Sequence, residues 1–172
     1  MTTTLITERL TLTPVQASDY DDLRALWADP DFIRHLFPDP LSGEDVWFRL
    51  LRDVGHWEVL GHGNWTARLK DDGAYVGSVG VLDYHRTLDP PFDAPELGWG
   101  LNPRFQGQGY AFEALSAALA WVDDALNAPR TVCMISPDNA PSIALARRAG
   151  YAPYVETVYK GEPVTLFERT AA

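Results

Sequence analysis

One stretch of this chain restricts the possible folds more than any other. In residues 96–111 an alternating segment runs into a glycine-rich turn and then into an apolar helical pattern. Leu97, Trp99 and Leu101 alternate with small or polar residues, which is the period-two pattern of a strand. Asn102-Pro103 then stops the strand. The sequence therefore predicts a strand, a turn and a helix in direct succession.

The turn has the composition of an anion site. Gly107 and Gly109 stand where the first turn of a helix exposes backbone N–H groups without intrahelical acceptors. Without a Cβ there, an anion can approach the backbone, and the positive end of the helix dipole and Arg104 attract it. Phe112 breaks the dinucleotide motif, and no Gly-Lys-Ser/Thr follows, so we expect a different phosphate-bearing ligand. The structural alternative is a plain tight turn.

The rest of the chain alternates between strand and helix patterns. Alternation predicts strands at 7–13, 65–69, 75–84, 96–101, 130–136, 154–159 and 164–169, and helical spacing predicts helices near 18–28, 42–54, 111–122 and 139–149. Because a helix separates strands 96–101 and 130–136, we expect a right-handed crossover and near-parallel pairing. The glycine-rich turn then lies at the carboxyl end of a strand, where open α/β sheets bind ligands.

Length and charge limit the classes of protein. A chain of 172 residues predicts one domain, residues 1–172. A net charge of −10 argues against nucleic acid and anionic membranes and favours a cationic partner. Cys133 is the only cysteine, so a cysteine metal cluster is excluded, and its apolar neighbours predict a core position. Met1-Thr2-Thr3-Thr4 lacks the basic and apolar regions of a secretory signal, and no apolar run has membrane-spanning length, so we expect a cytoplasmic protein.

Four segments resemble a known family. They are Thr7-Glu8-Arg9-Leu10-Thr11-Leu12, Glu96-Leu97-Gly98-Trp99, Arg104-Phe105-Gln106-Gly107-Gln108-Gly109-Tyr110-Ala111, and Asn139-Ala140-Pro141-Ser142 leading to Ala149-Gly150-Tyr151. The third matches an Arg/Gln-x-x-Gly-x-Gly/Ala signature. In order, spacing and context the chain resembles the GCN5-related N-acetyltransferase (GNAT) superfamily, and within it the ribosomal-protein N-terminal (alanine/serine) acetyltransferase-like branch.

The resemblance implies a fold and a cosubstrate. The fold would be α/β (α+β), with a mixed, mostly antiparallel twisted sheet of about six or seven strands and about four helices, splayed between the fourth and fifth strands. The cosubstrate would be acetyl-CoA, and no metal is expected. The Leu101 N–H would polarise the thioester carbonyl, and Asn139 would contact the CoA arm as well as cap a helix. The implied cofactor-binding residues are Leu101, Arg104, Gln106, Gly107, Gln108, Gly109, Tyr110, Ala111, Asn139 and Ser142.

Acetyl transfer to an amine requires a neutral amine and therefore a base. Glu96 is the candidate by the same resemblance, and Gly98 and Gly100 would leave room for substrate beside it; the alternative is a solvated glutamate at a strand start. Ser142 would face the thioester or the CoA phosphates, or be an ordinary first-turn residue. Ala146 stands where the family often has a proton donor, seven residues after the asparagine.

The candidate residues for binding the acceptor are Phe32, Phe37 and Trp47. These aromatic side chains either line a substrate pocket or pack the core. The predicted function is transfer of an acetyl group to a primary amine, on a small molecule or a protein N-terminus, by direct attack. The alternative is an acyl-CoA-binding sensor without turnover, which Ala146 keeps open. A homodimer is possible in either case.

Overall fold

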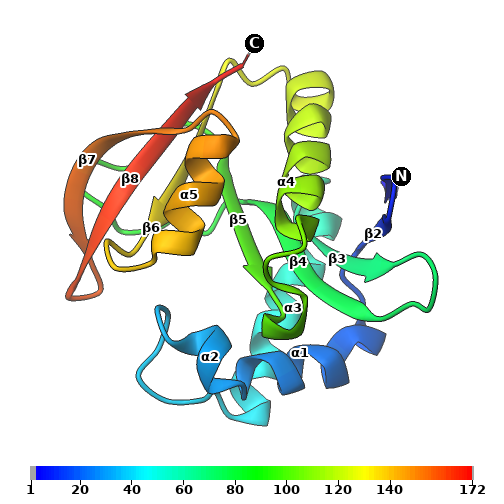
Figure 1. The fold of residues 1–172 in the computed structure, drawn as a ribbon. Helices are drawn as coiled ribbons and strands as arrows, with labels where there is room; N and C mark the ends of the chain where they lie inside the picture. The colour runs from blue at the N-terminus through cyan, green and yellow to red at the C-terminus, as the bar shows by residue number, and fades with distance from the viewer. Residues whose placement is uncertain (1–2, 172) are drawn as a thin grey trace.

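The computed structural model describes residues 3–171, so Met1 and Thr2 of the N-terminal prediction lie outside the described part. One sheet contains all the strands, in the order β1-β2-β3-β4-β5-β6-β8-β7 (Figure 1). The strands are β1 (Leu5–Ile6), β2 (Leu10–Pro14), β3 (Asn64–Leu69), β4 (Tyr75–Leu82), β5 (Glu96–Leu101), β6 (Arg130–Ile135), β7 (Ala152–Tyr159) and β8 (Glu162–Thr170). The helices are α1 (Tyr20–Trp27), α2 (Pro30–Ile33), α3 (Gly43–Leu60), α4 (Tyr110–Trp121) and α5 (Ala140–Arg148).

The predicted fold class is confirmed, with small differences in the number of elements. The sheet has 8 strands where six or seven were expected, because the two-residue β1 pairs with β2 outside the predicted first strand. The short helix α2 was not predicted. It begins with Pro30 and is capped by Asp29, whose carboxylate accepts the Asp31 N–H at 2.9 Å.

The splay of the sheet is the feature that positions the site. Every neighbouring pair of strands is antiparallel except β5 and β6, which run parallel. Whereas β4 pairs with β5 at six positions, β5 meets β6 only at Glu96↔Val132, at the start of both strands. Beyond that point the two strands diverge, so the carboxyl end of β5 has an open edge (Figure 1).

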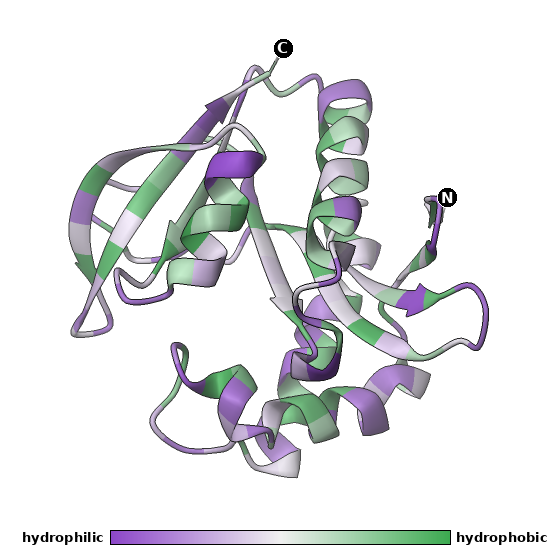
Figure 2. Cartoon of the chain, viewed as in Figure 1, coloured by the Kyte–Doolittle hydropathy of each residue, from purple (hydrophilic) through white to green (hydrophobic). Residues whose placement is uncertain are grey.

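The two faces of β5 have different neighbours. Leu97 belongs to the buried core that α4 covers with Leu115 and Leu119. On the opposite face η1 (Ala17–Asp19) and α1 attach to β3, because the Asp19 carboxylate accepts bonds from Thr66 and Arg68 at 2.7 and 2.9 Å. Figure 2 shows mostly green and white residues along α4 and purple ones in the β3–β4 hairpin loop, in agreement with the buried positions of Leu115 and Leu119 on α4.

Candidate active site

A glycine cradle connects β5 to α4. After β5, η2 (Pro103–Phe105) turns the chain, and Gly109 caps α4 with φ of +84°. Gly107 also has a positive φ, +74°, and both conformations favour glycine because a Cβ would be strained there. The first bond of the helix runs from the Glu113 N–H to the Gly109 carbonyl at 3.1 Å. Within residues 3–171, the N–H groups of Tyr110–Phe112 therefore have no backbone acceptor in α4.

The cradle is open to solvent. Gln106–Gly109 are exposed, and Arg104 beside them is exposed as well, with its guanidinium 5.7 Å from the ring centre of Phe105. The helix dipole adds positive potential at the same place. The structure thus brings the predicted residues Arg104–Ala111 together at one helix start that can hold a phosphate group.

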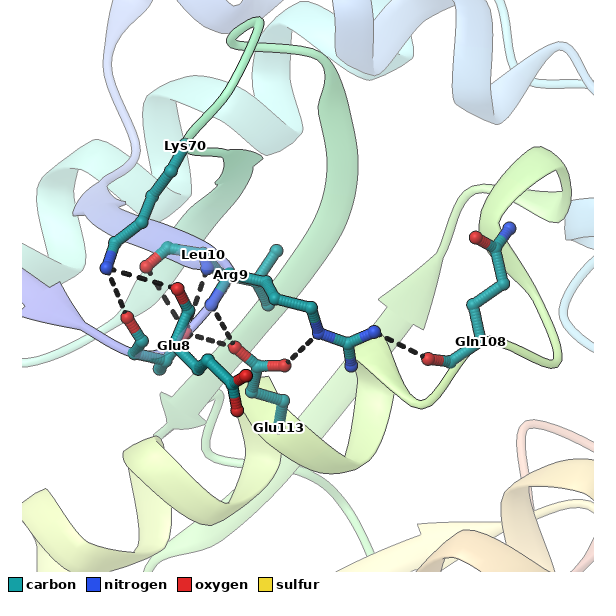
Figure 3. Close-up of polar contacts among 7 residues, drawn as sticks. Glu8, Arg9, Leu10, Lys70, Gln108 and Glu113 are labelled. Atoms are coloured by element: carbon teal, nitrogen blue, oxygen red, sulfur yellow. Dashed lines mark hydrogen bonds and ion pairs between the residues drawn. The ribbon is translucent and has the colours of Figure 1, made fainter.

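Arg9 supports the cradle through contacts with Glu113 and Gln108. Its Nε donates to Glu113 Oε2 at 2.7 Å and its Nη1 to the Gln108 carbonyl at 2.9 Å, while Glu113 Oε1 accepts the Arg9 N–H and the Thr7 hydroxyl (Figure 3). The guanidinium also lies over the Tyr110 ring, 4.2 Å from its centre. The segment before β2 is thereby tied to the loop 99 residues away in sequence.

The open edge of β5 presents main-chain groups. The Asn102 N–H donates to the Val76 carbonyl of β4 at 2.8 Å. Because N–H directions alternate along a strand, the N–H groups of Leu101 and Trp99 point away from β4, toward the splay. The Pro95 carbonyl, which has the same parity, accepts the Val132 N–H of β6 at 3.0 Å, in agreement with this alternation.

Glu96 lies at the vertex of the splay and is buried, with 5% of its surface exposed. Its Oε2 accepts a bond from Arg86 Nε at 2.7 Å, and Arg86 also donates to the Tyr159 hydroxyl at 3.1 Å. Burial raises the pKa of Glu96 above its ordinary value, and the hydrogen bond and charge of Arg86 oppose this only in part. A solvated glutamate is therefore excluded, and the carboxyl group has the raised pKa that suits a base.

The expectation that Gly98 and Gly100 leave free room beside Glu96 is wrong. A Cβ on Gly98 would lie 2.7 Å from the Leu82 side chain, and one on Gly100 would lie 2.9 Å from the Phe32 ring. The missing side chains let Leu82 and Phe32 approach the strand. Phe32 is thus placed against β5 on the same face as Glu96.

The opposite wall of the splay is the start of α5. Asn139 caps this helix, since its Oδ1 accepts the Ser142 N–H at 3.2 Å. The Ser142 hydroxyl oxygen accepts a bond from Trp99 Nε1 at 3.3 Å, which joins α5 to β5. Nearby, His35 Nδ1 lies 3.3 Å from Asp138, so the α2–α3 connection also reaches this end of α5.

The three predicted acceptor residues are only partly brought together. Phe32 and Phe37 both pack edge-on against Trp27, at centroid distances of 5.0 and 5.9 Å. Trp47 instead packs against Tyr20 at 5.5 Å. It lies two positions before Arg49, whose guanidinium covers Phe37, and residues two apart on a helix point in nearly opposite directions. Phe32 and Phe37 therefore share one side of the site and Trp47 does not.

Comparison with known proteins decides the family. The model of the acetyltransferase (GNAT) domain matches residues 9–152. The chain belongs to the GNAT acetyltransferase family. Membership identifies it as an N-acetyltransferase.

Relatives agree with this assignment. The uncharacterized N-acetyltransferase p20 of Bacillus licheniformis is 27% identical over 83% of this chain and 78% of its own length. An acetyltransferase from Agrobacterium tumefaciens is 30% identical, with a TM-score of 0.85 over 98% of this chain and 95% of that one. The ribosomal L7/L12 α-N-protein acetyltransferase RimL, solved with coenzyme A, shares the fold at 17% identity, with a TM-score of 0.79 over 98% of both chains.

Several residues of this acetyltransferase site were not predicted. Arg9 lies in a segment whose resemblance to the family was recognised, but the sequence gives no sign of its partner Glu113. Arg86 stands in a proline-rich loop without a strand or helix pattern. Among residues 3–171 no group of three His, Cys, Asp or Glu side chains can hold a metal, and no helix has the length and apolarity needed to cross a membrane.

Two predictions about single residues have clear outcomes. Cys133 is buried in the core as predicted, and burial raises the pKa of its thiol far above the ordinary value. Ala146, which replaces the usual proton donor, is completely buried within the same core. A larger polar side chain at 146 would therefore need the surrounding core to rearrange.

Proposed function

We propose that this acetyltransferase moves an acetyl group from acetyl-CoA to a primary amine by direct attack within a ternary complex. The observation that carries the proposal is the open edge of β5, which runs from the buried Glu96 to the glycine cradle at Gly107–Gly109. One ligand with a phosphate group and an extended, amide-containing arm fits both features.

The cradle and the open edge of β5 would bind different parts of acetyl-CoA. The free N–H groups at Tyr110–Phe112 and the charge of Arg104 would hold the pyrophosphate. The pantetheine arm would pair with β5 as an added strand, using the N–H of Leu101 first. Asn139 and Ser142 would line the other side of the arm, at the start of α5.

The backbone N–H that binds the thioester carbonyl has a candidate nearer to Glu96 than the N–H of Leu101. The rise of a strand separates the Cα atoms of Leu101 and Glu96 by about 16 Å, so with Leu101 as the donor Glu96 would act through intervening water. Trp99 is about 10 Å from Glu96 by the same measure, and its N–H points to the same open edge. We therefore assign the Trp99 N–H to the thioester carbonyl and Leu101 to the arm.

Glu96 would take the proton that the amine must lose. The neutral amine nitrogen forms a bond to the carbonyl carbon, the C–S bond breaks, and the electron pair leaves on the thiolate of CoA. The nitrogen then loses its extra proton to that thiolate or to solvent, which leaves a neutral amide. Because Ser142 Oγ accepts from Trp99 Nε1, its O–H is free to donate a hydrogen bond that stabilises this thiolate. Since a thiol has a pKa of roughly 8.5, departure as thiolate is feasible even with Ala146 in place of a proton donor.

The acceptor is an amine on a small molecule or at a protein N-terminus. RimL acts on the N-terminus of a ribosomal protein, as its name states, but its low identity carries only the fold to this chain. A cytoplasmic location and a homodimer remain predictions.

The test combines binding with turnover. We expect acetyl-CoA at about 100 times its Kd to stabilise the protein by about 2.7 kcal/mol, and thiol release to appear with an amine pool. Glu96→Gln should lower kcat about 10²- to 10⁴-fold and leave the acetyl-CoA stabilisation unchanged. Glu156→Gln, an exposed glutamate on β7, is the control and should retain activity.

Each other outcome has a definite meaning. Stabilisation without thiol release with any amine would support the acyl-CoA sensor. Full activity in Glu96→Gln would remove the base assignment, and the absence of stabilisation would remove the cradle.

A further inference from the structure

The chain has a basic groove on the acceptor side, although its net charge is −10. An open groove of about 410 Å³ lies between one face of α3 and the α2–α3 connection. Its lining residues are Phe37, Leu41, Asp45, Phe48, Arg49 and Arg52. Arg49 and Arg52 stand one helical turn apart and point to the same side.

Arg49 is the unusual residue of this groove. It is half-buried, and its guanidinium lies over the rings of Trp27 and Phe37, 4.7 and 4.9 Å from their centres. Burial lowers the pKa of Arg49, and the neighbouring charge of Arg52 lowers it further. Within residues 3–171 its side chain makes neither an ion pair nor a hydrogen bond.

The nearby carboxylates are already engaged. Asp45 accepts the hydroxyl and the N–H of Ser42, at 2.6 and 3.3 Å, as the cap of α3. Asp53 accepts bonds from Arg52, Asn64 and Tyr84, all within 3.0 Å. In the part of the chain that the structure describes, Arg49 therefore keeps a desolvated charge and several N–H donors without an anionic partner, which is the state of an arginine that binds a ligand anion.

A series of side-chain contacts leads from the groove to the proposed base. The Arg52 guanidinium lies 3.9 Å from the centre of the Tyr84 ring, and that of Arg86 lies 5.1 Å from the same centre. Arg86 in turn binds Glu96. The Tyr84 ring and the Arg86 guanidinium thus lie between Arg52 and Glu96, so an acceptor must be long enough to pass them in order to reach both ends.

We propose that the acceptor is an amine that also carries a carboxylate, which Arg49 binds while the amine faces Glu96. This inference rests on the proposed acetyl transfer and names the acceptor class. It reverses the expectation of a cationic acceptor, because Arg52 is paired with Asp53 and the charge that the acceptor meets is therefore that of Arg49 and not that of the whole chain. A guanidinium that packs against two aromatic rings still presents a pair of parallel N–H donors, which a carboxylate matches.

The experiment uses acceptors that differ only in charge. Linear ω-amino acids from glycine to 6-aminohexanoate are compared with their primary amides, and the ω-aminoalkyl phosphonates form a third series. Thiol release from acetyl-CoA gives kcat/KM for each. We expect at least one chain length to favour the acid over the amide about 10- to 100-fold. A preference confined to phosphonates would overturn the carboxylate assignment.

Variants locate the effect. Arg49→Leu keeps an apolar side chain against Trp27 and Phe37, so it should abolish the preference for the acid over the amide. Arg49→Lys should retain a part of the preference. Arg147→Leu removes an exposed arginine from the far end of α5 and should behave as the wild type.

A second readout separates this inference from the proposed function. N-acetyl-ω-amino acids carry the anion but no amine, so their binding needs no turnover. They should raise the melting temperature of the wild type more than their amides do, and Arg49→Leu should lose that difference. If the difference persists while no amine is acetylated, the anion site stands and acetyl transfer fails. If amines are acetylated without any preference for the acid, and Arg49→Leu changes nothing, Arg49 only packs on the rings and the inference fails.

Discussion

The two halves of the site are built in opposite ways. The glycine cradle is made from consecutive residues, Gln106–Ala111, and acts through backbone N–H groups. The arginine cluster, Arg49, Arg52 and Arg86, is made from side chains of α3 and of the loop after β4. A contiguous motif shows its chemistry in the sequence, whereas a site assembled from distant segments shows it only when distances are known.

Among the variants that compare the two halves, the largest effect on acetyl-CoA binding should come from filling the cradle. Gly109→Ala and Gly73→Ala both place a Cβ on a residue with positive φ, +84° and +74°, but Gly73 lies in the β3–β4 hairpin. We expect each variant to lose about 1–2 kcal/mol of stability. Only Gly109→Ala should raise the KM for acetyl-CoA, by about tenfold or more. Steady-state kinetics and thermal melts measure the two effects, and equal KM values would contradict the cradle.

Loss of the contacts of Arg9 with Glu113 and Gln108, here called the clamp, should have a smaller effect. Arg9→Met removes the bonds to Glu113 and Gln108, so the loop loses its support and the KM for acetyl-CoA should rise about 5- to 10-fold, with kcat retained. Lys70→Met is the matched control, because Lys70 binds the carbonyls of Thr7 and Glu8 in the same segment without touching the loop (Figure 3). A similar rise in both variants would mean that Arg9 only holds its own segment.

On the acceptor side, Arg86→Gln should change the pH dependence. Burial raises the pKa of Glu96 and Arg86 opposes the rise, so removing Arg86 should raise that pKa further. A base acts when deprotonated, so the acidic limb of kcat/KM should move to higher pH. The profile is measured with one amine from pH 5 to 9, and Arg147→Gln serves as the control. If the acidic limb stays in place or moves to lower pH, Glu96 is not the group whose titration it reports.

The smallest effect concerns the stability of the clamp. Burial tends to raise the pKa of Glu113, but the bonds from Thr7 and Arg9 outweigh it and lower the pKa below the ordinary 4.5. A lowered folded-state pKa gives stability that is present above the unfolded value and is lost as pH falls through the folded one. Glu113→Gln should therefore lower the melting temperature by about 2–4 °C at pH 7 and by less at pH 3. Equal losses at both pH values would indicate lost packing instead of lost charge.

Much of the fold was predictable because its signals are local. The order of the strands and main helices, the crossover from β5 to β6 and the glycine cradle follow from patterns that span fewer than twenty residues each. α2 was missed because four residues are too few to show a helical period. The space beside Gly98 and Gly100 was misjudged because a glycine can make room for a neighbouring side chain as well as for a ligand.

The sequence by itself determined the family, the class of fold and the position of the cradle, since each depends on residues that are neighbours in the chain. Only the tertiary structure decided that Glu96 is buried against Arg86, that Arg9 supports the cradle and that Arg49 has no carboxylate partner among residues 3–171. Desolvation and ion pairing depend on which distant segments meet. The net charge of −10 does not specify which charged side chains are buried or paired.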